Sequence, residues 1–241
     1  MESYIEFILF DCSYSILFGV SFGYFLLLYF GMGSLFLYVC KFLEQKKILT
    51  RINSTVVDKK QISFEIRHSL KSILVFGFSI IPIIYLIRAG LIDLLPNTVI
   101  TIVIGVGILT IWNEVHFYVI HRIMHHRFMM RHIHFIHHKS RIPTVFSVYS
   151  FHWIEALLLS TVPLTIVPFI PFSILAVFSY PIVSILLNFA GHCNYRFGNG
   201  TGDKWKLLGT HHNDHHKKGR ENYGFALHVL DEIFSSKTEN Q

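Results

Sequence analysis

Long apolar runs, separated by short polar segments, dominate the pattern of this chain. Three runs, at about 14–40, 72–91 and 98–120, approach or exceed the roughly 20 residues that a helix needs to cross a bilayer. A fourth run, 154–190, carries one charge near its start and is interrupted by Pro163, Pro168 and Pro171. Because this run is too long for one span and proline breaks helices, it predicts two spans or a re-entrant hairpin.

The pattern therefore predicts an all-α, polytopic membrane protein with four to five membrane helices. Composition supports this class, because 52% of the 241 residues are hydrophobic and only 15% are charged. Soluble domains carry about 25% charged residues. We expect the whole chain, 1–241, to form a single membrane domain.

The basic residues predict an orientation for these spans. Of the 21 lysines and arginines, all but Arg88 lie in three segments, 41–71, 122–141 and 196–237. Threading the chain through its spans places these segments on one side and the N-terminus on the other. The positive-inside rule makes the basic side cytoplasmic. Anionic lipid headgroups account for the net charge of +6, and without a nucleic-acid-binding motif we expect no nucleic-acid partner.

Most of the 16 histidines fall on that same side, in segments with helical spacing. The segments are "HRIMH" (121–125), "HFIHH" (134–138) and "HNDHH" (212–216), and in a helix each would present its histidines on one face. Thr210 is expected to cap a short helix around the last segment, and Gly219 to end it. With the histidine at the exit of the proline-containing run, the candidate metal ligands are His121, His125, His134, His137, His138, His192, His212, His215 and His216.

Nine imidazoles exceed the four to six ligands that one metal ion takes, so they predict a site for two ions. Neutral imidazole is the commonest metal ligand in proteins. The three cysteines are scattered, which argues against an iron–sulfur cluster or a cysteine-type zinc site. Imidazole suits zinc, copper, iron and nickel alike, so the ligands by themselves leave the ion open.

With these motifs the chain resembles the fatty acid hydroxylase / sterol desaturase superfamily of integral-membrane di-iron enzymes. "GHCNY" (191–195), "ENYGF" (221–225) and "LDEIF" (230–234) add to the resemblance, which covers about residues 98–235. It implies a fatty acid hydroxylase-like catalytic region at 98–235, after N-terminal spans and a basic loop at 1–97 and before a tail at 236–241. It also implies two irons held by the nine histidines, with zinc as the alternative ion in isolated protein, and a histidine-rich helical cap on the cytoplasmic face.

Several further residues are candidates for the surroundings of this site. His152 is a candidate tenth ligand or a hydrogen-bond partner of one, with Glu155 behind it, although a histidine at the membrane surface is an equally good interpretation. Glu114 lies two helical turns before the first motif, where an acid in a membrane helix suggests a function. Asp214 and Asp231 could each orient an imidazole or simply be solvated.

The resemblance implies an O2-dependent oxidoreductase that hydroxylates or desaturates a membrane lipid such as a sterol or fatty acyl chain. The chain carries no glycine-rich nucleotide-binding motif, so electrons are expected from a separate reductase through a redox carrier. The alternative is a membrane metal-binding or metal-transport protein without oxidative turnover. Transporter sites, however, lie near the bilayer midplane, whereas these histidines lie at the membrane exits.

Overall fold

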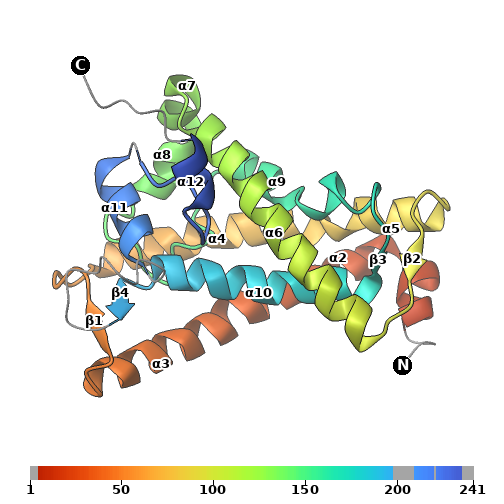
Figure 1. The fold of residues 1–241 in the computed structure, drawn as a ribbon, viewed down its shortest axis with the longest axis horizontal. Helices are drawn as coiled ribbons and strands as arrows, with labels where there is room; N and C mark the ends of the chain where they lie inside the picture. Colours follow the sequence, from red (N-terminus) through yellow and green to blue (C-terminus); the bar gives the residue numbers. More distant parts are fainter. Residues whose placement is uncertain (1–4, 198–208, 220, 235–241) are drawn as a thin grey trace.

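The computed structural model describes residues 5–197, 209–219 and 221–234. It is built almost entirely from helices, which confirms the expected fold class (Figure 1). Its helices, with η for π- or 3-10-helical segments, are η1 (Phe7–Asp11), α2 (Tyr14–Leu26), η2 (Leu27–Met32), α3 (Gly33–Gln45), α4 (Lys59–Phe78), α5 (Ile80–Arg88), α6 (Val99–Met124), α7 (Arg127–Met129), η3 (Met130–His134), α8 (Phe135–His138), α9 (Trp153–Ser160), η4 (Pro163–Thr165), α10 (Ile174–His192), α11 (Thr210–Lys218) and α12 (Val229–Phe234). The strands are β1 (Leu49–Arg51), β2 (Leu94–Leu95), β3 (Phe172–Ser173) and β4 (Tyr195–Phe197).

Within the described residues, four helical runs are long and apolar enough to cross a membrane, which confirms a multi-pass membrane protein. They span Tyr14–Gln45, Lys59–Arg88, Val99–Met124 and Ile174–His192. The second run begins well before the apolar stretch at 72–91. Asp58 caps its first turn by accepting a hydrogen bond from the Gln61 backbone N–H, at 2.7 Å. This cap allows polar residues to form the first turns of the helix.

The proline-containing run forms a broken hairpin and then a complete span. The eight-residue α9 is followed by irregular chain with η4, and only α10 is long enough to cross a membrane. The irregular part packs against α6, where Trp112 Nε1 donates to Thr165 Oγ1 at 2.9 Å and His116 Nε2 lies 3.1 Å from Thr161 Oγ1. Such backbone is tolerated at membrane depth where protein surrounds it.

Close helix packing and two short strand pairs hold the spans together. α2 packs against α4, and α6 packs against α10. A Cβ added at Gly105 of α6 would lie 2.7 Å from Ala176 Cβ of α10, so this glycine permits the close approach. β1 pairs antiparallel with β4, and β2 pairs parallel with β3. The sequence pattern did not predict these four strands.

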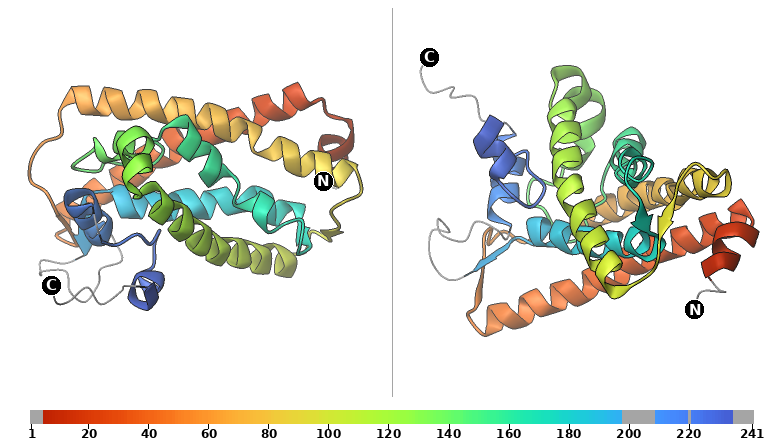
Figure 2. Two further views of the ribbon diagram at one scale, coloured as in Figure 1. Left: turned by 90° about the horizontal axis from the view of Figure 1, so that it is seen from above. Right: turned by 45° about the vertical axis from the view of Figure 1, so that its right-hand side comes forward.

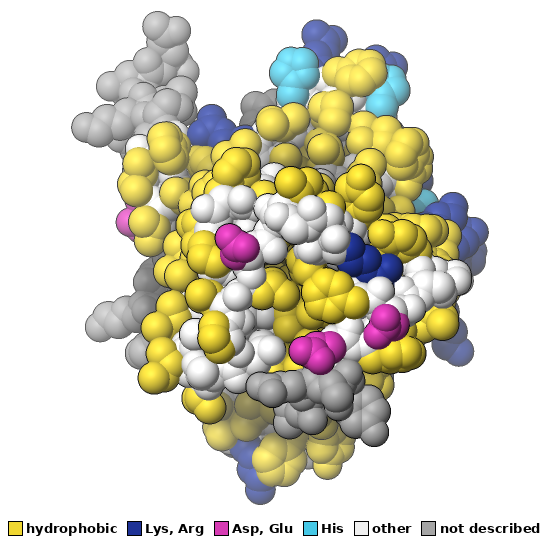
Figure 3. All heavy atoms as spheres, turned by 90° about the vertical axis from the view of Figure 1, so that its right-hand side faces the viewer, with side chains coloured by type: hydrophobic (Ala, Val, Ile, Leu, Met, Phe, Trp, Pro, Cys, Tyr) yellow, Lys and Arg dark blue, Asp and Glu magenta, His cyan; other side chains and the backbone are white. Residues whose placement is uncertain are grey.

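The two ends of the bundle differ in their elements and in their charge. β1, β4, α8 and α11 lie at one end, whereas η1, β2 and β3 lie at the other, and two further views agree (Figures 1 and 2). The N-terminal end exposes mainly hydrophobic and some acidic side chains (Figure 3). Glu6 and Asp11 at η1 and Asp93 directly before β2 are exposed. Arg88 belongs to this end because its guanidinium donates to the carbonyls of Leu9 and Cys12, at 2.5 and 2.7 Å.

Candidate metal centre

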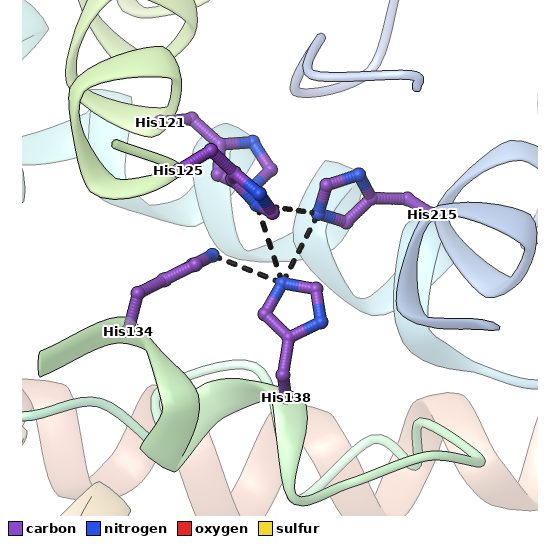
Figure 4. A group of neighbouring side chains, drawn as sticks. All are labelled: His121, His125, His134, His138 and His215. Atoms are coloured by element: carbon purple, nitrogen blue, oxygen red, sulfur yellow. Dashed lines mark hydrogen bonds between the residues drawn. The ribbon is translucent and has the colours of Figure 1, made fainter. Parts of the chain in front are cut away.

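The nine histidines named as candidate ligands lie together at the end of the bundle opposite the N-terminus. They form two groups, and within each group one ring nitrogen per residue lies within 4.8 Å of all the others. The five-histidine group (Figure 4) consists of His121, His125, His134, His138 and His215. The four-histidine group consists of His137, His192, His212 and His216.

Each three-histidine motif contributes to both groups. His134 and His138, four residues apart, join the five-histidine group, while His137 joins the other. In the last motif the residues four apart join the four-histidine group, and His215 joins the five-histidine group. Consecutive residues in a helix point about 100° apart, so neighbours such as His137 and His138 diverge. The three histidines of a motif were expected to share one helical face, whereas in the structure they serve two different groups.

Local backbone structure sets where these side chains begin. α6 ends one residue before His125. The π-helical η3 ends at His134 and leads into α8, which carries His137 and His138. α11 ends at Gly219, whose φ of 70° is the left-handed conformation that glycine adopts easily, as predicted. The predicted cap at Thr210 is wrong by one position. Gly209 precedes the helix with φ 60°, and Thr210 is its first residue.

Hydrogen bonds to one ring nitrogen leave the other free to face the centre of each group. Nδ1 of His121 lies 2.9 Å from the Tyr223 carbonyl oxygen, Nδ1 of His215 lies 2.6 Å from that of Glu221, and Nδ1 of His192 lies 2.9 Å from that of Asn188. A carbonyl only accepts, so each Nδ1 carries the proton and donates it. Each Nε2 is then an unprotonated acceptor, which is the form that binds metal.

Inside each group the Nε2 atoms approach one another closely. His138 Nε2 lies 3.1 Å from His134 Nε2 and 3.2 Å from His215 Nε2, and His212 Nε2 lies 2.9 Å from His192 Nε2. One proton on His138 Nε2 could point to only one of its two neighbours. In at least one of these two contacts, therefore, the lone pairs of two Nε2 atoms face each other with no proton between them. This arrangement of donor atoms fits a cation in each group.

Burial keeps these rings neutral and able to bind metal at neutral pH. Burial, together with the neighbouring His215, lowers the pKa of His125 to about 3. Burial, followed by His215 and His125, lowers the pKa of His138 to about 2. Burial also lowers the pKa of His215 to about 4. Protonation therefore does not compete with a metal ion for these lone pairs at pH 7.

A segment at 221–227, which we call the strap, positions two of the imidazoles through its backbone. Its Glu221 and Tyr223 carbonyls are the acceptors of the His215 and His121 rings. Asp231 accepts hydrogen bonds from the backbone N–H groups of Tyr223 and Gly224, at 2.9 and 2.8 Å. Asp231 therefore contacts the strap, which in turn orients the rings.

Glu114 holds the other part of the strap, and this role could not be read from helical spacing. Its carboxylate accepts from the backbone N–H groups of Ala226, at 3.1 Å, and Leu227, at 3.3 Å. Sequence reasoning placed Glu114 near the ligands because it lies on the same helix as His121. That reasoning missed the strap, since backbone carbonyls have no sequence signal.

The remaining predicted residues divide into one direct partner and two that lie apart. Glu155 Oε1 lies 2.8 Å from His134 Nδ1, and both side chains are buried. Asp214, half-buried on α11, makes no hydrogen bond to the nine histidines in the described part of the chain. His152 belongs to neither group. Its Nδ1 accepts from the Ile154 backbone N–H at 3.2 Å and caps α9.

A largely apolar cavity in the membrane part of the bundle ends beside the histidines. It contains about 670 Å³ of empty space, including its open mouth. The lining residue Phe151 has its ring centre 4.9 Å from that of His137, and the Phe117 ring lies 4.9 Å from that of His121. Phe225 of the strap also lines the cavity. A lipid in this cavity would therefore lie next to both groups.

Comparisons with known proteins identify the family of the chain. The family model described as fatty acid hydroxylase matches residues 106–236. Lathosterol oxidase of Rattus norvegicus is 29% identical over 193 residues, and that of Mus musculus is 28% identical, each alignment covering 74% of this chain. The chain spans 62% of the length of these relatives. No solved structure matches it. With more than half of its length matched by the family model, the chain belongs to the fatty acid hydroxylase family.

Proposed function

We propose that this protein is an O2-dependent oxidoreductase that hydroxylates or desaturates a membrane lipid. Two iron ions would be held by the nine histidines, one in each group. The observation that carries the proposal is the convergence of unprotonated imidazole nitrogens at the end of a largely apolar cavity. Iron bound there would supply the electrons that reduce O2 and the oxidant that removes hydrogen from an unactivated C–H bond.

The chain's own residues would position the lipid and keep water away from it. Phe117, Phe151 and Phe225 surround the end of the cavity nearest the histidines. An acyl or sterol carbon among these rings would lie next to the metal ligands while the rest of the lipid stays in an apolar environment. The Glu155 carboxylate and the strap carbonyls would fix the ring orientations and favour the metal-binding tautomers.

We further propose that residues 98–235 form the catalytic region and that the histidine groups face the cytoplasm, with the N-terminus on the opposite side. The positive-inside rule supports this orientation, because basic segments flank the histidine end. A soluble, acidic redox carrier could then reach the basic surface and deliver electrons from a separate reductase. The alternative, metal transport, has less support because both groups lie at one end of the bundle.

The test measures bound metal and product in the same preparations. Protein purified in detergent should contain about two irons per chain, as expected for two separate ligand sets. His137→Ala should lower the metal content, and His215→Ala should weaken the binding of the other ion. Each substitution should abolish lipid oxidation with a reductase and O2. His132→Ala is the matched control, since His132 is exposed and its Nδ1 lies 2.9 Å from the Phe128 carbonyl oxygen. Stoichiometric zinc, or metal that survives both substitutions, would contradict the proposal.

A further inference from the structure

Three asparagines join separate segments of the chain beside the four-histidine group. Asn53 lies between β1 and α4, Asn194 lies between α10 and β4, and Asn213 lies on α11. Asn53 Nδ2 donates to Asn194 Oδ1 at 3.0 Å and to Asn213 Oδ1 at 2.9 Å. An amide nitrogen carries two hydrogens, so one side chain holds both acceptors at once. The Asn53 side chain therefore bridges the end of α10 and the start of α11.

Further hydrogen bonds fix the direction in which the other two amides face. Asn194 Nδ2 donates to the Asn53 backbone carbonyl at 3.1 Å, and Asn213 Nδ2 donates to the Gly209 carbonyl at 2.8 Å. A carbonyl only accepts, so neither amide can turn over without losing its bond. Asn194 and Asn213 must both present oxygens to position 53. The bridge therefore needs a side chain that donates twice, as the asparagine amide does.

Each acceptor of this bridge is a close neighbour of a candidate metal ligand. Asn194 comes two residues after His192, and Asn213 comes one residue after His212. The Nε2 atoms of these two histidines lie 2.9 Å apart inside the four-histidine group. A movement of α11 away from the end of α10 would separate them. The Asn53 bridge opposes that movement, so it sets the spacing of two ligands.

The backbone around the bridge is held before any metal ion binds. β1 pairs with β4, and the Ile52 backbone N–H donates to the Asn194 carbonyl at 2.9 Å. A Cβ added at Gly209 would lie 2.6 Å from the Tyr195 carbonyl oxygen, so the turn before α11 packs directly against β4. Asn53 therefore acts from a fixed position, as a residue that supports a metal site must.

We propose that Asn53 is a positioning residue for the metal ion of the four-histidine group. This inference rests on the proposed function and adds a residue from outside the proposed catalytic region, 98–235. Asn53 also lies outside residues 106–236, the part of the chain that the family model matches. It acts through the neighbours of two ligands and sets their geometry without coordinating the ion. The loop between the first two spans then completes the metal centre.

The experiment measures metal binding without turnover. The metal-free full chain in detergent is titrated with Co²⁺, whose visible absorption depends on its coordination geometry. Asn53→Leu, which keeps the approximate size and removes both donors, should weaken one of the two ions about tenfold, the ordinary size of one buried hydrogen bond. The absorption of that ion should also change. A residue that only supported the fold would lower the thermal midpoint of metal-free protein and leave the absorption of loaded protein unchanged.

The same substitution in two backgrounds assigns the effect to one group. In a His216→Ala background, which keeps the five-histidine ion, Asn53→Leu should change the Co²⁺ affinity little, because the His215 ring on α11 donates to the Glu221 carbonyl. In a His125→Ala background, the four-histidine ion should show the full weakening. Weakening confined to the His216→Ala background would contradict the inference.

Further variants test whether the bridge itself carries the effect. Asn213→Leu should weaken the same ion, and the double variant with Asn53→Leu should bind no more weakly than Asn213→Leu alone, because both substitutions break one bridge. Asn97→Leu is the matched control with unchanged Co²⁺ binding. Its side chain accepts a comparable hydrogen bond from the Leu175 backbone N–H, at 3.1 Å, beside β2 at the other end of the bundle.

Three results would overturn the inference: an unchanged affinity and absorption in Asn53→Leu, additive effects in the double variant, or no Co²⁺ binding by the unmodified protein. Failure of the proposed function looks different. The unmodified protein would then bind two ions without oxidising any lipid, while Asn53→Leu would still weaken the ion of the four-histidine group.

Discussion

The two histidine groups differ in what holds their imidazoles in place. In the five-histidine group, His121 and His215 donate to strap carbonyls and His134 faces Glu155, while His125 and His138 are only half-buried. This group therefore depends on a layer of hydrogen-bond acceptors around it. It also contains one ligand more than a tetrahedral site requires.

The four-histidine group relies on burial instead. All four of its members are buried, and His192 donates to the Asn188 carbonyl within its own helix. Nδ1 of His137 and Nδ1 of His216 have no hydrogen-bond partner among the described residues. Similar sets of imidazoles can therefore be positioned either by hydrogen-bond partners or by packing. We expect metal binding by the two groups to respond differently when a hydrogen-bond partner or a ligand is removed.

Removing both ions should have the largest effect, because each group then keeps lone pairs without a cation. Treatment with a chelator should lower the midpoint of thermal unfolding by about 10 °C, the shift expected for loss of tightly bound ligands. Differential scanning fluorimetry in detergent measures this. Adding back Fe²⁺ should restore the midpoint and Mg²⁺ should not, since imidazole is a poor ligand for Mg²⁺. An unchanged midpoint would argue against metal in either group.

Removing one ligand from each group tests the comparison directly. His216→Ala leaves three histidines in the buried group and should reduce the metal content from about two ions per chain to about one. His125→Ala leaves four in the other group and should keep nearly two ions, bound more weakly. Metal analysis after dialysis distinguishes the variants. Equal losses would mean that the fifth histidine is an essential ligand and not a spare one.

Removing the acceptors around the five-histidine group should have a smaller effect. Glu155→Ala removes the partner of His134 and should weaken binding of one ion by about 10- to 100-fold, as loss of a ligand's hydrogen-bond partner does. Glu114→Gln should weaken it less, because Glu114 acts through the strap backbone. Asp214→Asn is the control with unchanged affinity. Metal titrations monitored by Co²⁺ absorption provide the readout, and equal weakening of both ions would refute the division into groups.

The smallest effect is expected at the basic surface. Lys217→Glu changes an exposed charge on α11 and should reduce turnover supported by an acidic carrier by a fewfold at low salt, while metal content stays constant. Lys59→Glu, exposed at the start of α4, is the control for net charge. Equal slowing by both would indicate a general electrostatic effect and no specific docking surface.

The sequence predicted the spans and the nine histidines because their signals are local. Apolar runs report membrane helices directly, and histidines four residues apart on a helix share a face. The division of His137 from His138 was not predicted, because it depends on how α8 faces two partners far away in the sequence. The start of α4 at Lys59 was missed because a capping aspartate has less weight in a hydropathy pattern than an apolar run.

Backbone contributions account for most of what sequence reasoning missed at the site. The strap orients His121 and His215 through carbonyls that every residue possesses, so no side chain marks it. The roles of Glu114 and Asp231 follow from that hidden segment. Asn53 and Asn213 lie far apart in the sequence, and only the packing of the folded chain brings them together.

The alternation of neighbouring histidines between the groups has a consequence for how the centre is loaded. His137 with His138, and His215 with His216, are pairs of adjacent residues that serve different groups. A metal ion bound in either group would immobilise α8 and α11, which also carry ligands of the other group. The second ion would then bind with a smaller loss of conformational entropy. We therefore expect cooperative uptake, in which half-loaded chains are scarce during titration. Native mass spectrometry would then record mainly empty and fully loaded protein.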